Sequence, residues 1–274
     1  MSKKIIFQTS YMQRCGHNFL SEVLRIFLPV DTPVYDTSEI AISNVMGSIH
    51  KTIHKQSARF PQLIEWTESV CRDGIRKEIL KRGTQEFIMI KNVNVRDFTP
   101  FYESFPDDYH LILFRDPRNT VTSFIKSVKL NKGKAHKVFI RKIAYYSGYY
   151  HYYFAKRVKN ELDMFLTALE KLKAKENKKF ILVTYESLVS GEDKELSKLI
   201  QFFNQNMDVD ELKDKMSKIK ILNSSYKHEE KNKNEVNSAK NKDFDPFNRW
   251  KKLPILQRKG LLLALDNIHQ KMGY

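Results

Sequence analysis

The chain has 274 residues, of which 41% are apolar and 12% aromatic, so it can bury the core of one large domain and is too apolar to be disordered throughout. Its formal net charge of +16 calls for an anionic partner: a nucleotide, a nucleic acid, an anionic glycan or a membrane surface. Its two cysteines, Cys15 and Cys71, lack metal-ligand spacing, which argues against a disulfide scaffold and fits a reducing compartment.

The first apolar segment, residues 4–9, is too short for a signal peptide, and we expect it to form a buried strand. A basic turn follows at residues 14–18, and an apolar helix extends from there to Leu28. No apolar run approaches the roughly 20 residues that span a bilayer, so we expect no transmembrane segment and a cytoplasmic protein.

The middle of the chain predicts two more strands and several helices. A short extended piece is expected around residues 33–35, and residues 39–82 carry apolar side chains at three- and four-residue spacing, which predicts helices. The apolar segments 86–91 and 109–114 predict buried strands, with a short helix over 98–105 between them.

The strand over residues 109–114 is followed by a second basic turn, Arg115-Asp116-Pro117-Arg118, and by a helix that carries Ser123. The N-terminus of a helix offers unpaired N–H groups and the positive end of a dipole, so a basic turn entering a helix predicts an anion site. Two such turns in one domain indicate a ligand with phosphate at both ends.

The second half of the chain continues the alternation of strands and helices. Residues 134–175 predict one long helix or a kinked pair, 180–185 predict the last strand, and 195–203 predict a helix. Residues 224–245 are polar and charged, which predicts a mobile loop, either a solvated connection or a lid over ligand. Structure should resume at residues 247–252, before an apolar C-terminal helix.

This order of elements predicts the fold class: one α/β domain over residues 1–274 with a mainly parallel central sheet flanked by helices. We expect helical insertions at about residues 35–82 and 130–175, and the mobile loop at about 224–245. Sheets of this kind bind ligands beyond the carboxyl ends of their strands, where both basic turns are expected.

The first turn, Arg14-Cys15-Gly16-His17-Asn18-Phe19-Leu20, lacks the G-x-x-x-x-G-K-[ST] pattern, which disfavours an ordinary kinase or GTPase. It resembles the loop [KR]-S-G-T-[TN]-[WF]-L of the sulfotransferases that use 3′-phosphoadenosine 5′-phosphosulfate (PAPS). In that family the loop holds the 5′-phosphosulfate.

Three further segments carry the same resemblance. Arg115 to Ser123 is similar to the family's R-D-P-R-x-x-x-x-S frame for the 3′-phosphate, and Tyr185-Glu186-Ser187-Leu188 is similar to its Y-E-x-L segment near the adenine. Arg249-Trp250-Lys251 is similar to the R-W-[KR] segment of bacterial and Golgi-type members, which include carbohydrate sulfotransferases.

The resemblance implies a P-loop-NTPase-like sulfotransferase fold and transfer of a sulfuryl group from PAPS to a hydroxyl or amine of a glycan or small molecule. It implies that Arg14 stabilises charge on the departing 5′-phosphate, that Arg115 and Ser123 bind the 3′-phosphate, and that Phe19 and Tyr185 pack on adenine. The remaining expected donor contacts are Cys15, Gly16, His17, Asn18 and Arg249. No metal and no nucleic acid is expected.

The acceptor also needs a base. Many members have a His in a K-T-H segment, but the aligned stretch here is Lys91-Asn92-Val93-Asn94, so another residue must serve. The candidates are Glu39, Asp36, His50 and His54; a neutral histidine is chemically apt for this role.

Two other functions remain open at this point. The charge of +16 and the Lys-rich helices would also suit a nucleic-acid-binding protein, although no nucleic-acid-binding motif is present. The second alternative is a family member that binds a nucleotide without catalysis. It is possible because Cys15 and His17 stand where the family has residues that carry a hydroxyl group. Salt-dependent binding of nucleic acid would favour the first, and tight binding of adenosine 3′,5′-bisphosphate (PAP) without turnover the second.

Overall fold

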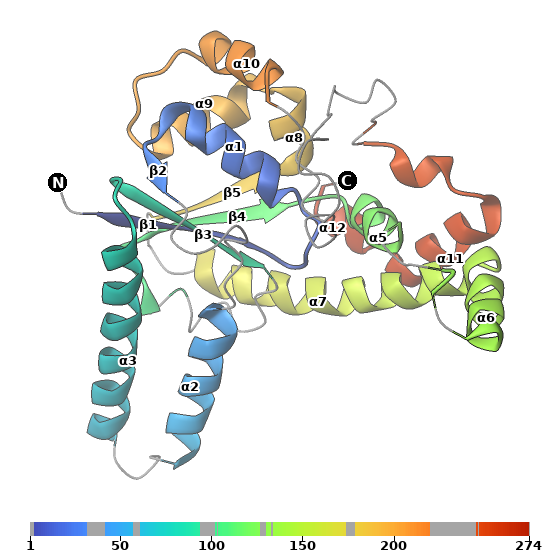
Figure 1. Cartoon of the computed structure of the whole chain (residues 1–274), viewed down its shortest axis with the longest axis horizontal. Helices are drawn as coiled ribbons and strands as arrows, with labels where there is room; N and C mark the ends of the chain where they lie inside the picture. The colour runs from blue at the N-terminus through green and yellow to red at the C-terminus, as the bar shows by residue number, and fades with distance from the viewer. Residues whose placement is uncertain are drawn as a thin grey trace.

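Five strands form one parallel sheet in the order β2-β3-β1-β4-β5 (Figure 1). The strands are β1 (Lys4–Ser10), β2 (Val30–Asp31), β3 (Phe87–Val93), β4 (Tyr109–Phe114) and β5 (Phe180–Thr184). The central strands are almost fully buried, because they are apolar on both faces and helices cover both. The predicted α/β fold with a mainly parallel sheet is confirmed.

The computed structural model describes residues 3–31, 42–56, 61–93, 102, 104–126, 130–132, 134–173, 179–219, 245 and 247–273. The expected extended piece at 33–35, most of the short helix expected over 98–105, and all of the expected loop over 224–245 except Asp245 lie outside these residues.

The helices of the described residues are α1 (His17–Phe27), α2 (Ile42–Gln56), α3 (Pro61–Arg82), α5 (Pro117–Ile125), α6 (Ala135–Tyr146), α7 (Tyr149–Lys173), α8 (Tyr185–Ser190), α9 (Asp193–Phe202), α10 (Val209–Ser217), α11 (Ile255–Leu265), α12 (Ile268–Lys271) and the 3-10 helix η2 (Arg249–Lys252). None of them is long and apolar enough to cross a membrane.

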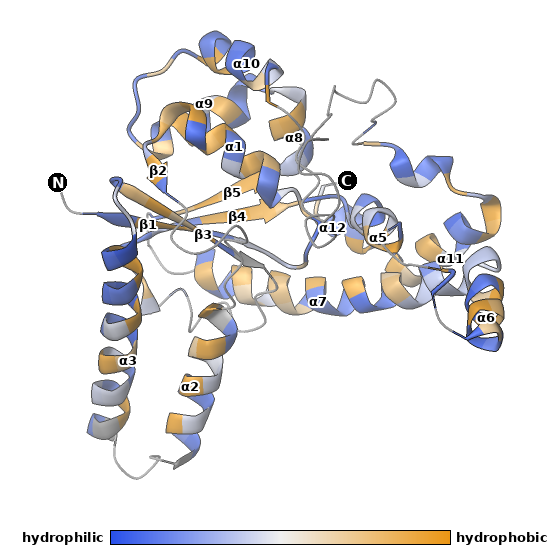
Figure 2. Ribbon diagram, viewed as in Figure 1, coloured by the Kyte–Doolittle hydropathy of each residue, from blue (hydrophilic) through white to orange (hydrophobic). Residues whose placement is uncertain are grey.

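The helices form layers on the two faces of the sheet, with α1, α9 and α10 on one side and α7 and the α2–α3 pair on the other (Figure 1). Alternate residues of β1 point to opposite faces, as strand geometry requires. Ile6 belongs to the cluster that includes α1 and α9, whereas Ile5 and Phe7 pack with residues of α2 and α3. Figure 2 shows β4 and β5 as largely apolar, as befits strands covered on both sides.

One open alternative is resolved and one boundary differs from the sequence-based expectation. Of the two alternatives for residues 134–175, the structure has the pair of helices, because Gly148, with φ 84°, interrupts the helix between α6 and α7. Tyr185, expected to end the last strand, instead begins α8, so its ring enters the site from a helix N-terminus. An apolar run does not reveal on which residue a strand becomes a helix.

The order of the strands places β1 beside β4, and the chain leaves these two strands toward opposite edges of the sheet: from β1 toward β2 and β3, and from β4 toward β5. Such a switch point opens a crevice at the carboxyl ends of the two strands. The turns that enter α1 and α5 lie at this crevice, as the sequence predicts (Figure 1).

Candidate functional site

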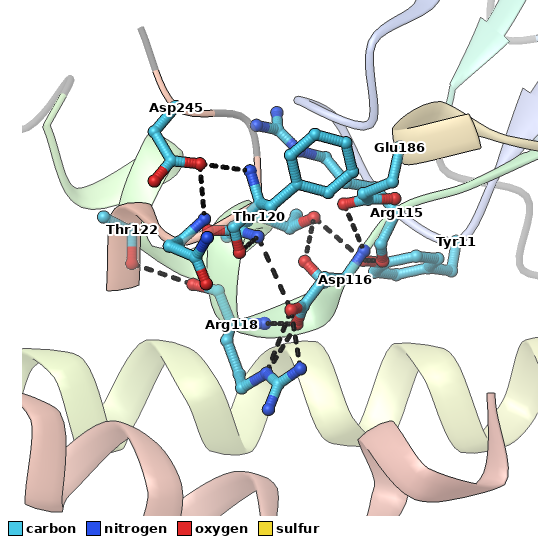
Figure 3. Close-up of polar contacts among 11 residues, drawn as sticks. Tyr11, Arg115, Asp116, Arg118, Thr120, Thr122, Glu186 and Asp245 are labelled. Atoms are coloured by element: carbon cyan, nitrogen blue, oxygen red, sulfur yellow. Dashed lines mark hydrogen bonds and ion pairs between the residues drawn. The ribbon is translucent and has the colours of Figure 1, made fainter. Parts of the chain in front are cut away.

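The two basic turns are in direct contact. Arg115 donates a hydrogen bond from Nη1 to the carbonyl oxygen of Arg14, over 2.7 Å. Tyr11 Oη donates to the carbonyl oxygen of Arg115, also over 2.7 Å, and lies 2.9 Å from Thr120 Oγ1 of α5 (Figure 3). The loop after β1 and the loop after β4 are therefore held together as one unit.

The first turn leaves the N-terminus of α1 open. Gly16 is the N-cap residue, no side chain caps the helix, and no acidic residue lies in its first turn. Gly16 has φ 106°, and a Cβ added there would lie 2.1 Å from Cδ2 of Tyr185, so only glycine fits. The first N–H groups and the dipole of α1 are therefore available to an anion.

The side chains of Cys15 and His17 point inward from this turn. Burial raises the pKa of the Cys15 thiol to about 11, so it stays protonated. Burial, and then the charge of Lys91, lowers the pKa of His17 to about 3, and its ring bonds to the backbone of Thr9. Both side chains are neutral and enclosed, so these residues can meet a ligand through their backbone N–H groups.

Lys91 lies beside the first turn. Its Nζ donates to Oδ1 of Asn18, the second residue of α1, over 2.7 Å. From the sequence, Lys91 was expected only to begin the segment aligned with K-T-H, and it had no predicted role. Its signal was a lysine at the carboxyl end of an otherwise apolar strand, a position that parallel sheets use for ligands.

The second turn is built differently, because Asp116 fills the N-terminus of α5. Its carboxylate accepts hydrogen bonds from Arg118 N, over 2.8 Å, and from Arg118 Nε, over 2.9 Å. Glu186 Oε1 in turn accepts from Asp116 N over 3.1 Å (Figure 3). Because this carboxylate already caps the helix, the N–H groups at this helix end are less available to an anion, and the anion site expected at the second turn stays a prediction.

At the second turn the group available to an anion is the side chain of Arg115. It is 4% exposed, and its Nε and Nη2 have no hydrogen-bond partner among the described residues. Its Cζ lies 4.4 Å from the centroid of the Tyr185 ring. A buried guanidinium without a carboxylate partner is costly, so these two N–H groups mark a place for an anionic ligand.

The segment 247–252 docks against α5. Asn119 Nδ2 donates to the carbonyl oxygen of Phe247 over 2.9 Å, and the guanidinium of Arg118 lies 4.6 Å from the centroid of Trp250. Asp245 Oδ1 accepts from the N–H groups of Phe247 and Asn248 (Figure 3). These contacts carry Arg249 to the same end of the sheet as Arg115.

Four cations gather where this segment meets α5: Arg115, Lys126, Arg249 and Lys252. The pKa of Arg249 is lowered, first by burial and then by the charge of Arg115. The pKa of Lys126 is lowered by burial, by Arg249 and by Lys252. Mutual repulsion of this kind is relieved when an anion binds.

Ser123 follows Asn119 by four residues and precedes Lys126 by three, which is the spacing of one helix face. Asn119 contacts the docked segment directly. Ser123 is half-buried there. Lys126 and Lys252 were not predicted as members of this cluster, although Lys126 follows Ser123 by three residues and Lys252 follows the R-W-K segment.

Tyr185 joins the parts of the site. Its ring covers Gly16, stacks on Arg115, and meets Phe19 edge-on at a centroid distance of 6.3 Å. Tyr185 is 7% exposed, while Phe19 is half-buried, so Phe19 offers the more open ring. Arg14, also half-buried, has φ 73° at the tip of the first turn.

Of the expected base candidates, the structure describes His50 and His54, which lie on α2. Glu39 and Asp36 lie outside the described residues. His50 bonds Glu68 of α3 through Nδ1 over 2.6 Å, and His54 lies 3.5 Å from the same carboxylate. The base remains a prediction.

No protein-family model and no curated protein matches the chain. Among solved structures, the sulfotransferase domain from the Synechococcus PCC 7002 olefin synthase aligns over 100% of this chain and 96% of its own, with TM-score 0.50 and 12% identity. Mouse sulfotransferase SULT7A1, solved complexed with PAP, aligns over 99% and 86%, with TM-score 0.51 and 14% identity. At these identities the likeness shows a shared fold.

Proposed function

We propose that this chain, which has the sulfotransferase fold, transfers a sulfuryl group from PAPS to a hydroxyl or amine of a glycan or small molecule. The observation that carries the proposal is the buried guanidinium of Arg115, whose Nε and Nη2 have no partner among the described residues, near the N-terminus of α1, where the N-cap is a glycine. A ligand with an anionic group at each end matches both features, and PAPS carries a 3′-phosphate and a 5′-phosphosulfate.

The two ends of the donor are distinguished by what each turn offers. The open N-terminus of α1, with Gly16 and the neighbouring backbone of Cys15, His17 and Asn18, suits the 5′-phosphosulfate. Arg115, with Ser123 and the cations of the docked segment, suits the 3′-phosphate. The half-buried ring of Phe19, supported by Tyr185, would carry the adenine.

Arg14 would then act on the leaving group. In sulfuryl transfer the bond between sulfur and the bridging oxygen of the 5′-phosphate breaks as a bond from sulfur to the acceptor oxygen or nitrogen forms. Negative charge grows on the bridging oxygen, and a fixed guanidinium at the turn stabilises it without giving up a proton. Lys91, held against Asn18, is a second cation near the same end.

The proton that leaves the acceptor needs a base, for which Glu39, Asp36, His50 and His54 stay candidates. The acceptor class, a glycan or a small hydroxylated or aminated molecule, also rests on the resemblance. A cytoplasmic location is likewise proposed.

The direct test is conversion of PAPS to PAP, followed by chromatography with and without a pool of glycan, phenol and amine acceptors. Wild-type protein should release PAP faster with a suitable acceptor, and Arg14→Ala should slow release by about 100-fold or more, the usual effect of losing one charge-stabilising group. If wild-type protein binds PAP but leaves PAPS intact with every acceptor, the chain is a nucleotide-binding protein without catalysis.

A further inference from the structure

The helices α2 and α3 pack side by side as a pair that extends away from the sheet (Figure 1). Near the sheet the pair is held by apolar contacts: Ile42 and Met46 of α2 and Ile79 of α3 belong to one buried cluster with β1 and β3. The face of α2 that starts with Ile42 and Met46 continues in steps of four residues to His50 and His54. Apolar packing is thus replaced by two imidazoles farther along the same face.

Both histidines meet one carboxylate. His50 Nδ1 lies 2.6 Å and His54 Nε2 3.5 Å from Oε1 of Glu68, while the two imidazole rings are 4.1 Å apart. One nitrogen from each histidine and one Glu68 oxygen all lie within 4.8 Å of one another. The three side chains are between 34% and 49% exposed, so solvent ions can reach them.

We propose that His50, His54 and Glu68 bind a divalent transition-metal ion such as Zn²⁺, which joins α2 to α3. Two imidazole nitrogens and one carboxylate oxygen are a ligand set that Zn²⁺ accepts, with water completing four-coordination. Ligand atoms at about 2 Å from a tetrahedral ion lie roughly 3.3 Å apart, close to the separation of His54 and Glu68. His50 is already aimed at the same oxygen, and the ion would replace its hydrogen-bond proton.

The surroundings favour an ion over a simple hydrogen-bonded cluster. Among the described residues, these three side chains pair with one another, and no lysine or arginine neutralises Glu68. Two large apolar side chains of α3 on either side of Glu68 in the sequence are exposed: Trp66 is 64% and Val70 54% exposed. A shared metal would add a link between the helices at the position of Glu68. This inference does not rest on the donor site of the proposed function, but it takes His50 and His54, two of the base candidates, as metal ligands instead.

The test is calorimetric titration of tag-free, chelator-treated protein with zinc chloride. Wild-type protein should bind one Zn²⁺, and Glu68→Gln and His54→Gln should each weaken binding by more than about tenfold. Glu65→Gln, one turn earlier on α3, and His136→Gln, on α6, make the same changes outside the cluster and should bind as wild type. Circular dichroism checks that every variant is folded, which the exposure of the replaced side chains favours.

A second readout is thermal unfolding. Zn²⁺ should raise the unfolding temperature of wild type and of His136→Gln, but not of Glu68→Gln. Cys71→Ser serves as a further control, because Cys71 is a half-buried thiol one turn after Glu68. The proposal is overturned if wild type shows no saturable binding, if Glu68→Gln binds as wild type, or if binding follows Cys71 instead.

Discussion

Arg115 carries a positive charge into the protein interior and leaves two of its donors without a partner among the described residues. The motif predicted this residue as a phosphate ligand, but only the structure shows that Asp116 and Glu186 are engaged elsewhere and do not neutralise it. A buried charge with incomplete pairing destabilises the ligand-free protein. We therefore expect Arg115 to lower the stability of the protein while it strengthens binding of an anionic ligand.

Replacing Arg115 by Met should separate these two effects. Removing the buried charge is expected to raise the free energy of unfolding of the ligand-free protein by about 1–2 kcal/mol in urea titrations. The same change should weaken PAP binding by more than about 100-fold, because two charge-assisted hydrogen bonds are lost. Arg157→Met, an exposed position on α7, is the matched control and should alter neither. A destabilised Arg115→Met protein that still binds PAP would contradict this view of the residue.

Gly16 offers a second test at the residue scale. Gly16→Ala places a Cβ against the Tyr185 ring at φ 106°, so we expect a loss of about 1–3 kcal/mol in unfolding free energy and weaker PAP binding. Gly74 has nothing within 4 Å of an added Cβ and lies inside α3, so Gly74→Ala should instead stabilise by about 0.5–1 kcal/mol. Thermal denaturation of both variants measures the contrast, and equal shifts would refute it.

Among the elements, β1, α1, β4 and α5 were predictable, because each apolar run and its basic turn are local in sequence. What could not be predicted is how distant elements complete the site. Tyr185 reaches Gly16 only because β5 lies beside β4 and α8 begins directly at Tyr185. The docking of residues 247–252 on α5 depends on the carbonyl of Phe247, which no side-chain pattern reveals.

This docking can be tested without touching a proposed ligand-binding group. Asn119→Ala removes the hydrogen bond to Phe247, so Arg249 should be held less firmly and PAP affinity should fall by about fivefold, equivalent to one hydrogen bond of about 1 kcal/mol. Thr122→Ala, on the same helix, removes only a bond to the carbonyl of Arg118 and should leave affinity unchanged. Calorimetry with PAP compares the two; identical affinities would argue against a positioning role for Asn119.

For the whole molecule, composition predicted the size of the domain and an anionic partner, and the alternation of apolar runs predicted the parallel sheet. The charge of +16 could not say where cations gather, because exposed lysines are spread over many of the described helices. The cluster of Arg115, Lys126, Arg249 and Lys252 arises from the contact between α5 and the docked segment.

Three buried histidines make the stability of the whole fold depend on pH. Burial lowers the pKa of His17 to about 3 and those of His110 and His151 to about 4. Below pH 6.5 the unfolded chain takes up protons that the folded chain excludes. The stability present above pH 6.5 is therefore lost on acidification toward pH 4, by at most about 1.4 kcal/mol per pH unit for each histidine.

Urea midpoints at pH 7.5, 6.0 and 5.0 measure this effect before most carboxylates titrate. The midpoint should fall steadily across the series. His110→Asn should reduce the slope with pH, whereas the exposed His136→Gln should not. A midpoint that stays constant or rises on acidification would show that these histidines are not held neutral.

The measurement that tests the central claim most directly is calorimetric titration with PAP at moderate salt, with AMP as the comparison ligand. We predict that wild-type protein binds PAP at least about tenfold more tightly than AMP, and that Arg115→Ala abolishes this difference because it removes the group facing the 3′-phosphate. Equal affinity for PAP and AMP in wild-type protein would contradict the donor site and direct attention to nucleic acids as the anionic partner.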